Sequence, residues 1–483
     1  MLPLNQIVQG DCLEVMKEIP SESIDCIITD PPYGYSFMGK DWDKAVPSVE
    51  TWRECLRVLK GGAFMFVMSA PRQDVLSQMI VRLGQAGFET GFTSIYWTYA
   101  SGFPKAMNIS LAVDKQECKK QLIKKLGREP TKEEFDEAWK TFRKVVGKLN
   151  RNDRELDNVE AGFFKQDEFG GRRKTQLNIT KPASEEAKLL DGSYGGFQPK
   201  PAVEVIIVCM KPLSEKTYVE QALKNGKGVM WLDDCRIPLQ TGEDISVERE
   251  EEKELDTNKQ GWGFKAVSRD NRGRFPANLL VSDDVLNDGR NHKSGHMDSI
   301  AKGDPTNQNV YGKMYERKVY SEGDSGSFSR YFDLDKWFLK TVENLPENVK
   351  KTFPFLICPK ASKSERNKGC ESLPEVTKSN LPLRDGTGEY VENTMGDGSK
   401  STRNTKTKNF HPTVKPLKLM TYLVTLGSCE GDVVLDPFVG SGTSCVVAKK
   451  LGRKFIGIEI NLAYVEIARR RLEAVPPRLD TFL

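Results

Sequence analysis

Near the start of the chain, four residues that could hold a planar amino group follow a short, mostly apolar segment. Residues 24–29 are rich in isoleucine and are ended abruptly by two prolines, which predicts a buried parallel strand. Ligands of open α/β sheets bind at the carboxyl end of such strands. Asp30 precedes Pro31 and should be extended, so its carboxylate leaves the strand, and the Pro31 carbonyl is a second acceptor. Pro32 and the ring of Tyr33 complete the group.

Two acceptors beside an aromatic ring suit an exocyclic amine on a heterocycle. Such an amine is a poor nucleophile because its lone pair is delocalised. Hydrogen bonds from its two N–H groups to Asp30 and the Pro31 carbonyl would favour a tetrahedral nitrogen and free the lone pair, mainly in the transition state. The Tyr33 ring can stack on the heterocycle. A strand-ending turn with a surface tyrosine is the alternative, but Asp-Pro-Pro-Tyr is rare at ordinary composition, which favours the chemical interpretation.

A second constellation lies near the other end of the chain. Residues 432–444, DVVLDPFVGSGTS, predict a strand that ends in Asp436, a turn with Gly440 and Gly442, and a helix that begins near Thr443. Glycines in such a turn let the backbone approach a flat or charged ligand closely.

This turn differs from the dinucleotide fingerprint G-x-G-x-x-G. Cys445 stands three positions after Gly442, so a pyrophosphate is not the natural ligand. A second strand over residues 454–458 leads into Glu459, about 20 positions beyond the glycines, where an acidic residue is placed to bind ribose hydroxyls. A purely structural loop is the alternative, but the position of Glu459 favours cofactor binding.

Together these motifs resemble the β-type, circularly permuted amino-group DNA methyltransferases, which use S-adenosylmethionine. Asp-Pro-Pro-Tyr comes first along the chain and Asp-Pro-Phe-x-Gly-x-Gly-Thr comes last. Residues 8–14 (VQGDCLE) and 411–416 (HPTVKP) resemble the family segments that contact the cofactor adenine and line its methionine end. Residues 231–238 (WLDDCRIP) and 273–280 (GRFPANLL) look like stretches of prophage-type and phage-type members.

The resemblance implies a set of functional residues. The implied catalytic residues are Asp30, Pro31, Pro32 and Tyr33. The implied cofactor-binding residues are Asp11, Cys12, Asp30, His411, Thr413, Lys415, Asp436, Pro437, Phe438, Gly440, Gly442, Thr443 and Glu459. No metal is expected, because the chain has three histidines and ten scattered cysteines, none in C-x-x-C spacing.

The implied substrate is an amine in double-stranded DNA. Asp30 as the first residue of its motif favours N6 of adenine, because family members with serine there more often modify cytosine. Cytosine N4 stays open, because its amine has the same geometry. An RNA or protein-amide methyltransferase, a non-catalytic DNA-binding module and a combined nuclease and methyltransferase are further alternatives. A homodimer and a restriction endonuclease partner stay open as well.

The implied fold is an α/β, Rossmann-like sheet, mostly parallel with one antiparallel strand and with helices on both faces. Residue patterns predict helices over 51–60, 72–87 and 131–147, and strands over 63–67, from Ile95, and over 203–209 as the antiparallel strand. The predicted domains are a catalytic half at 1–110 and 196–212, a charged helical insertion at 111–195, a target-recognition region at 213–350, and a cofactor-binding half at 351–483 with a mobile loop at 376–410.

Composition agrees with an intracellular enzyme. With 483 residues, 38% of them hydrophobic, the chain can bury a large core. Its 72 Lys and Arg against 68 Asp and Glu give a net charge of +4, so any basic surface for nucleic acid must be local. The chain has no apolar stretch of about 18 residues and no signal-peptide pattern, which predicts a cytoplasmic protein without a membrane span.

Overall fold

Contacts in the computed structural model divide the chain into two compact units. The first comprises Met1–Ser101 and Ala202–Leu483, and the second comprises Gly102–Pro201. The residues that the structure describes are 2–34, 45–99, 107–150, 176–196, 202–238, 273–282, 284–293, 299–301, 308–309, 312–313, 317–319, 325–353, 361–377, 383–384, 390–391 and 406–476.

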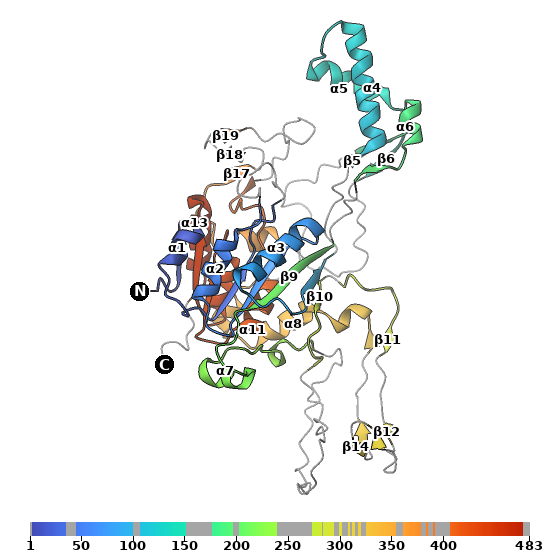
Figure 1. Cartoon of the computed structure of the whole chain (residues 1–483). Coiled ribbons are helices and arrows are strands. Elements are labelled where there is room, and N and C mark those ends of the chain that lie inside the picture. Colours follow the sequence, from blue (N-terminus) through green and yellow to red (C-terminus); the bar gives the residue numbers. More distant parts are fainter. Residues whose placement is uncertain are drawn as a thin grey trace, which may run out of the picture. The chain divides into compact units, whose positions relative to one another are not determined.

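An eight-stranded sheet forms the centre of the first unit (Figure 1). Its order is β1-β22-β21-β2-β3-β9-β4-β10, and only β9 runs antiparallel to the other strands of this sheet. The strands are β1 (Gln6–Gln9), β22 (Lys454–Glu459), β21 (Val433–Asp436), β2 (Cys26–Thr29), β3 (Phe64–Ser69), β9 (Val203–Met210), β4 (Ile95–Thr98) and β10 (Leu279–Val281). The predicted fold class, a mostly parallel sheet with one antiparallel strand, is confirmed.

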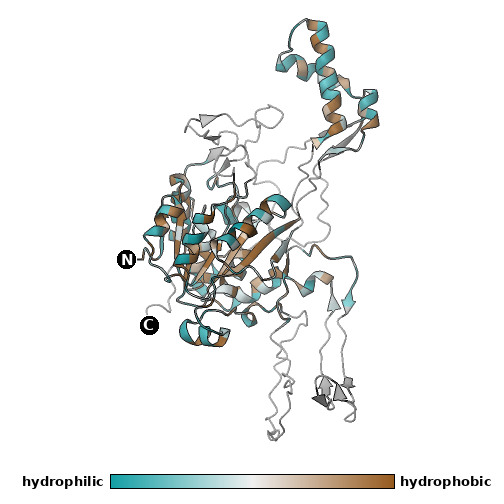
Figure 2. Ribbon diagram, in the orientation of Figure 1, coloured by the Kyte–Doolittle hydropathy of each residue, from teal (hydrophilic) through white to brown (hydrophobic). Residues whose placement is uncertain are grey.

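Successive residues of the inner strands point to opposite faces of the sheet, and both faces are apolar. Ile27 packs into the hydrophobic cluster on one face and Ile28 into the cluster on the other, and Val67 and Phe66 divide in the same way. Figure 2 shows the hydrophobic strands between helices whose outer sides are hydrophilic. Because the strands are apolar on both sides, helices must cover both faces.

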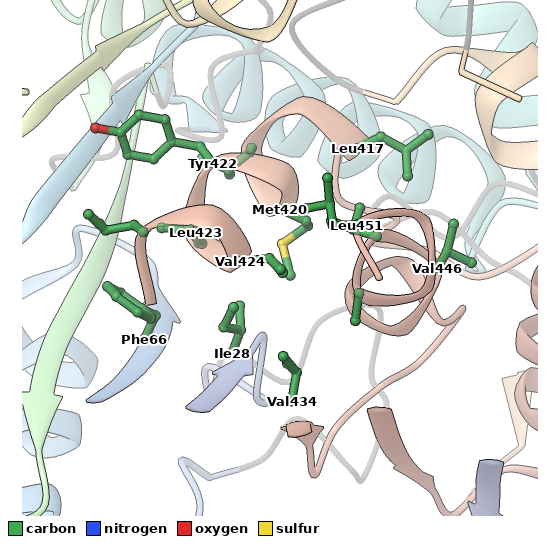
Figure 3. Packing of buried hydrophobic residues seen from close by; sticks show 14 of the residues in the cluster. Ile28, Phe66, Leu417, Met420, Tyr422, Leu423, Val424, Val434, Val446 and Leu451 are labelled. Carbon is green, nitrogen blue, oxygen red and sulfur yellow. The ribbon is translucent and has the colours of Figure 1, made fainter. Parts of the chain in front are cut away.

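Two groups of helices provide this cover. The face of Ile27 is covered by α1 (Cys12–Lys17), α2 (Val49–Val58) and α3 (Gln73–Ala86), and the face of Ile28 by α8 (Leu334–Glu343), α11 (Leu417–Gly427), α12 (Thr443–Lys450) and α13 (Leu462–Glu473). Every residue of α11 is buried. Figure 3 shows Met420 and Val424 of α11 over Ile28 and Val434 of the sheet, with α12 beside them.

The chain leaves β2 and β21 in opposite directions across the sheet. From β2 the chain continues to β3, on the side of the sheet that also holds β4. From β21 it continues to β22, on the side of the sheet that ends with β1. The two strands are nevertheless direct neighbours, with Cys26 opposite Val434 and Ile27 opposite Leu435. In α/β proteins, ligands bind beyond the carboxyl ends of strands at such a reversal.

The second unit contains α4 (Ile109–Leu126), α5 (Lys132–Phe142) and α6 (Glu185–Leu189), with the antiparallel pairs β5 (Met107–Asn108) and β8 (Tyr194–Gly195), and β6 (Val145–Asn150) and β7 (Gln176–Thr180). Asp114 of α4 is fully buried. It accepts hydrogen bonds from the backbone N–H groups of Ala183 and Ser184, both at 2.9 Å, and lies 3.3 Å from Arg143. Asp114 therefore ties α4 to the segment before α6.

The helix predicted over 131–147 ends earlier in the structure. It starts at a capping box of Thr131 and Glu134, but α5 stops at Phe142. The prediction is wrong for Val145 and the residues after it, which form β6. Two adjacent β-branched valines favour a strand, and β7 supplies the pairing partner that the local sequence does not reveal.

The other predicted elements are confirmed to within a few residues. Helices predicted over 51–60 and 72–87 correspond to α2 and α3, and the strand predicted over 63–67 corresponds to β3. The antiparallel strand predicted over 203–209 is β9.

Parts of the predicted target-recognition region at 213–350 belong to the sheet and its cover, because β10 and α8 lie within it. Most of the loop predicted at 376–410 lies outside the described residues.

The remaining elements are α7 (Tyr218–Asn225), η3 (Asp233–Cys235), η4 (Phe328–Tyr331), α9 (Glu347–Lys350), α10 (Lys363–Asn367), β11 (His292–Lys293), β12 (Ser299–Ala301), β13 (Gln308–Asn309), β14 (Gly312–Lys313), β15 (Arg317–Val319), β16 (Ser325–Gly326), β17 (Val376–Thr377), β18 (Leu383–Arg384), β19 (Tyr390–Val391) and β20 (Lys406–Thr407). None of the helices in the described part of the chain combines the length and the apolar character needed to cross a membrane.

A buried carboxylate ties β2 to β21 at their amino ends. Asp25 accepts a hydrogen bond from the backbone N–H of Val433 at 2.9 Å and pairs with Lys60 at 2.7 Å and Lys227 at 2.9 Å. Burial by itself would raise the pKa of Asp25, but the hydrogen bond from Lys60 and the other contacts outweigh burial and lower the pKa.

We predict that Asp25→Ala lowers the free energy of unfolding by about 3 kcal/mol, because it leaves the buried Lys227 with Asp432 as its remaining ion-pair partner. Denaturant unfolding of the full chain measures this change. Asp74→Ala is the matched control, since the pair of Asp74 with Arg72 is exposed, and should change stability by less than about 0.5 kcal/mol. Equal losses in the two variants would contradict the role of Asp25.

Candidate active site at the carboxyl edge of the sheet

Four acidic residues stand at the carboxyl ends of four neighbouring parallel strands. Asp11 follows β1, Glu459 ends β22, Asp436 ends β21 and Asp30 follows β2. Because parallel strands end at the same edge, these carboxylates form a row along one edge of the sheet. The motifs from opposite ends of the chain are in direct contact, since the Thr29 hydroxyl donates a hydrogen bond to Asp436 over 2.7 Å.

Asp30 belongs to a cluster of charged and aromatic side chains. The Tyr33 hydroxyl donates to Asp30 Oδ1 over 2.5 Å, and Lys415 Nζ lies 3.2 Å from the same oxygen. Lys415 Nζ also donates to Glu204 over 2.7 Å and to the Tyr33 hydroxyl over 3.2 Å. Among the described residues, Asp30 Oδ2 has no hydrogen-bond partner, so this acceptor remains for a ligand.

Burial and mutual charge set the protonation of this cluster. Burial raises the pKa of Asp30, and Lys415 opposes that rise. Burial would lower the pKa of Lys415, but the charges of Asp30 and Glu204 raise it well above its ordinary value, so the amine is an ammonium. Burial and the charge of Asp30 raise the pKa of Tyr33 well above its ordinary value, so the phenol stays protonated and remains a donor.

Glu204 and Tyr99 are site residues that sequence reasoning missed. Glu204 lies at the amino end of β9, and because β9 is antiparallel, its amino end reaches the same edge as the carboxyl ends of the other strands. Tyr99 directly follows β4, and burial followed by the charge of Glu204 raises its pKa. The available signal was a single carboxylate within the otherwise apolar segment 203–209.

The short helix α10 holds the segment that carries His411 and Lys415. Glu365 of α10 accepts a hydrogen bond from the backbone N–H of Leu417 over 2.6 Å, which fixes the start of α11. Arg366 donates to the His411 carbonyl over 2.5 Å. These contacts place Lys415, predicted to line the methionine end of a cofactor, against the predicted catalytic residues.

The glycine-rich turn after β21 has a backbone conformation that favours glycine. Gly440 has a φ of 52° and Gly442 a φ of 83°, both in the left-handed region. A Cβ at Gly440 would lie 2.6 Å from His411 Nε2, and a Cβ at Gly442 would lie 2.9 Å from the Cβ of Ala468. The turn is therefore closely packed on one side by His411 and on the other by α13, and α12 begins directly after it at Thr443.

Glu459 joins this turn to the tip of β22. Its carboxylate accepts hydrogen bonds from the backbone N–H groups of Gly440 at 3.0 Å and Asn461 at 2.8 Å. Burial raises the pKa of Glu459, although both hydrogen bonds oppose the rise. The Gly440 turn and Glu459, predicted from positions about 20 residues apart, are thus joined by a direct hydrogen bond.

The remaining predicted cofactor residues lie in different local environments. Asp11 caps α1 by accepting from the backbone N–H of Leu13 at 2.9 Å, and burial raises the pKa of the adjacent Cys12 thiol to about 12. Pro437 is buried, and Phe438 meets Trp52 edge to face at 6.2 Å. Thr413 is exposed, and its N–H lies 3.4 Å from His411 Nδ1.

An open hollow of about 850 Å³ lies elsewhere on the first unit. It is lined by residues at the amino ends of β1 and β22, including Gln6 and Lys454, and by Arg469 of α13. This hollow is at the opposite end of these strands from Glu459, so it is separate from the row of carboxylates.

The sequence profile of the DNA methylase family (N6_N4_Mtase) matches residues 24–470. This match covers most of the chain and includes the tips of β2, β21 and β22, whereas Asp11 lies before it. The chain belongs to this DNA methylase family.

Two type II methyltransferases share short, similar segments with this chain. M2.DpnII of Streptococcus pneumoniae is 52% identical over 77 residues, which is 16% of this chain and 29% of that protein. M.HpaI of Haemophilus parainfluenzae is 51% identical over 69 residues, which is 14% of this chain and 22% of that protein. The matched segments span less than a third of these relatives.

Solved structures also align with this chain at low similarity. The PvuII DNA methyltransferase (cytosine-N4-specific) is 12% identical with a TM-score of 0.35, covering 96% of this chain and 85% of that chain. The M1.HpyAVI–SAM complex is 13% identical with a TM-score of 0.32, covering 97% of this chain and 98% of that chain.

The protonation of Asp436 is expected to make the stability of this protein depend on pH. Burial raises the pKa of Asp436 to about 6 from an ordinary value of 3.8, although hydrogen bonds from Ser444, Thr29 and the backbone of Phe438 oppose the rise. Because the pKa of Asp436 is higher in the folded state than in the unfolded state, protonation of Asp436 stabilises the fold. This stabilisation is fully present below pH 3.8 and is lost as the pH rises through about 6.

We therefore predict that Asp436→Asn, which keeps the shape and stays neutral, gains stability relative to the wild type as the pH rises from 4 to 7. The expected relative gain is about 2 to 3 kcal/mol, measured by denaturant unfolding at each pH. A stability difference between the two proteins that is the same at every pH would contradict the raised pKa.

Proposed function

We propose that this chain is an amino-group DNA methyltransferase of the β-type, circularly permuted class. In this proposal it transfers a methyl group from S-adenosylmethionine to N6 of adenine in double-stranded DNA. One observation carries the proposal: β2 and β21 are neighbours, so the Asp30 cluster and the Gly440 turn stand side by side at one sheet edge. A group held by the turn and a base held by Asp30 can therefore meet.

The residues around the Gly440 turn fit the proposed cofactor. A Cβ at Gly440 would lie 2.6 Å from His411 Nε2, so the turn requires glycine here, and a ligand can approach its bare backbone closely. The Glu459 and Asp11 carboxylates, at the tips of adjacent strands, can accept hydrogen bonds from ribose hydroxyls and from an adenine amine. We propose that these residues hold the cofactor together with Asp436, Pro437, Phe438, Gly442, Thr443, Cys12, Thr413 and His411. When bound, S-adenosylmethionine supplies an electrophilic methyl group.

The Asp30 motif would hold the target amine. A base in a duplex hides its amine in a Watson–Crick pair, so it must be flipped out of the helix at a cost of a few kcal/mol. Asp30 Oδ2 and the Pro31 carbonyl can then accept the two N–H groups, Pro32 keeps the turn rigid, and the Tyr33 ring can stack on the base. Asp30 accepts a hydrogen bond from an amine N–H that becomes acidic only as the new C–N bond forms, so Asp30 need not be a strong base, and the released proton can leave to solvent.

We predict that Asp30→Ala and Tyr33→Ala lower methyl transfer by at least about 100-fold, because the first removes an acceptor of the amine and the second removes the ring that stacks on the base. Both variants should bind S-adenosylmethionine as tightly as the wild type in calorimetry, since the Gly440 turn is unchanged. Asp335→Asn is the control. Asp335 also pairs with a buried lysine, Lys418, but this pair lies away from the tips of β2 and β21. Full turnover in Asp30→Ala would refute the mechanism, and lost cofactor binding would assign Asp30 a cofactor or folding role.

The base that carries the methyl group can be identified directly. We predict N6-methyladenine in DNA treated with the protein and S-adenosylmethionine, because the motif begins with Asp30 rather than serine. Mass spectrometry of the digested nucleosides measures it. N4-methylcytosine without methyladenine would reject adenine as the target while keeping the amino-group reaction, and no methylated base would reject the proposed function.

A further inference from the structure

The contacts of Lys415 place a hydrogen-bond donor beside the acceptor of Asp30. Lys415 Nζ makes one short contact, 2.7 Å to Glu204, and two longer contacts of 3.2 Å, to Asp30 Oδ1 and to the Tyr33 hydroxyl. A contact of 3.2 Å lies at the long end of the hydrogen-bond range and is the more easily exchanged for a ligand atom. The Glu204 contact would then keep the ammonium in place.

Nucleobases differ in the order of donors and acceptors on their pairing edge. Adenine presents an amine donor next to the acceptor N1, and cytosine presents an amine donor next to the acceptor N3. Guanine and thymine present the reverse, a carbonyl acceptor next to an N–H donor. An acceptor next to a donor, as in Asp30 and Lys415, therefore complements the amino bases and opposes the keto bases.

The charge balance of the cluster supports a ligand-directed role for Lys415. A lone ammonium beside a nitrogen that gains positive charge on methylation would oppose the reaction. Glu204 pairs with Lys415 at 2.7 Å and neutralises its charge, so the pair can donate one hydrogen bond without adding net charge. The Lys415 side chain is 11% exposed and Glu204 is 18% exposed, so water screens this pairing little.

We propose that Lys415 reads the flipped base by donating a hydrogen bond to the ring nitrogen next to the target amine, while Asp30 accepts from the amine, and that Glu204 is the positioning residue for Lys415. This inference rests on the proposed function and deepens it, because it states how the site accepts an amino base and rejects a keto base. It differs from the expectation that Lys415 lines the methionine end of the cofactor.

The test uses duplexes in which single atoms of the target adenine are replaced. The recognised sequence is first mapped from methylated DNA of an expressing host, and duplexes are then made with 1-deazaadenine or 7-deazaadenine at the target. Both analogues keep the amine and the ring, but only 1-deazaadenine lacks the N1 acceptor. We expect wild-type kcat/KM to be about 10- to 100-fold lower for 1-deazaadenine than for 7-deazaadenine, the range for a hydrogen bond to a charged group.

The matching variant is Lys415→Met, which keeps the length of the side chain and removes the donor. Its 1-deaza to 7-deaza ratio should rise to about one, and Glu204→Gln should move the ratio part of the way while leaving calorimetric affinity for S-adenosylmethionine unchanged. Lys418→Met is the control, because Lys418 is also a buried lysine paired with a carboxylate, Asp335, and it should keep the wild-type ratio.

The possible outcomes test the role of Lys415 separately from the proposed function. Equal kcat/KM of the wild type for the two analogues would overturn the role of Lys415. This comparison does not depend on the folding of any variant. A wild-type ratio that persists in Lys415→Met would overturn it as well. No methylation of the unmodified duplex would instead refute the proposed function itself. If the methylated base is cytosine, the same comparison uses 3-deazacytosine, which lacks the N3 acceptor.

Discussion

The pairing of β2 with β21 is the contact on which the candidate site depends. These strands come from opposite ends of the chain, yet Cys26 lies opposite Val434 in parallel register. Asp25 fastens their amino ends and the Thr29–Asp436 hydrogen bond joins their carboxyl ends. Because the chain departs from them in opposite directions, both following loops are left beside each other at the sheet edge, where a cofactor and a base can meet.

The same edge concentrates charge, and the structure balances that charge locally. Asp30, Asp436 and Glu459 all have raised pKa values because they are buried at strand tips. Each carboxylate is held by a different partner: Lys415 for Asp30, hydroxyl and backbone donors for Asp436, and backbone N–H groups for Glu459. The site is thus assembled from acceptors that are desolvated but not left without donors, which suits the recognition of amines and hydroxyls.

Local patterns predicted the elements on which these residues stand. The short β-branched segments, the prolines after Asp30 and the glycines after Asp436 all act within a few residues of themselves, so β2, β21 and the start of α12 were predictable. The helix predicted over 131–147 was overextended because the strand β7, which pairs with Val145 and the residues after it, lies about 30 positions away.

The sequence by itself determined which residues have the chemistry of the site, because motif spacing and residue type are local properties: an aspartate before two prolines and a tyrosine, a glycine turn, and an acid after the next strand. Only the tertiary structure decided which of them act together. Glu204 joins Asp30 because β9 is antiparallel, and Lys415 faces Tyr33 because α10 holds the start of α11. Strand direction and long-range packing arise from contacts between distant segments, and no local pattern encodes them.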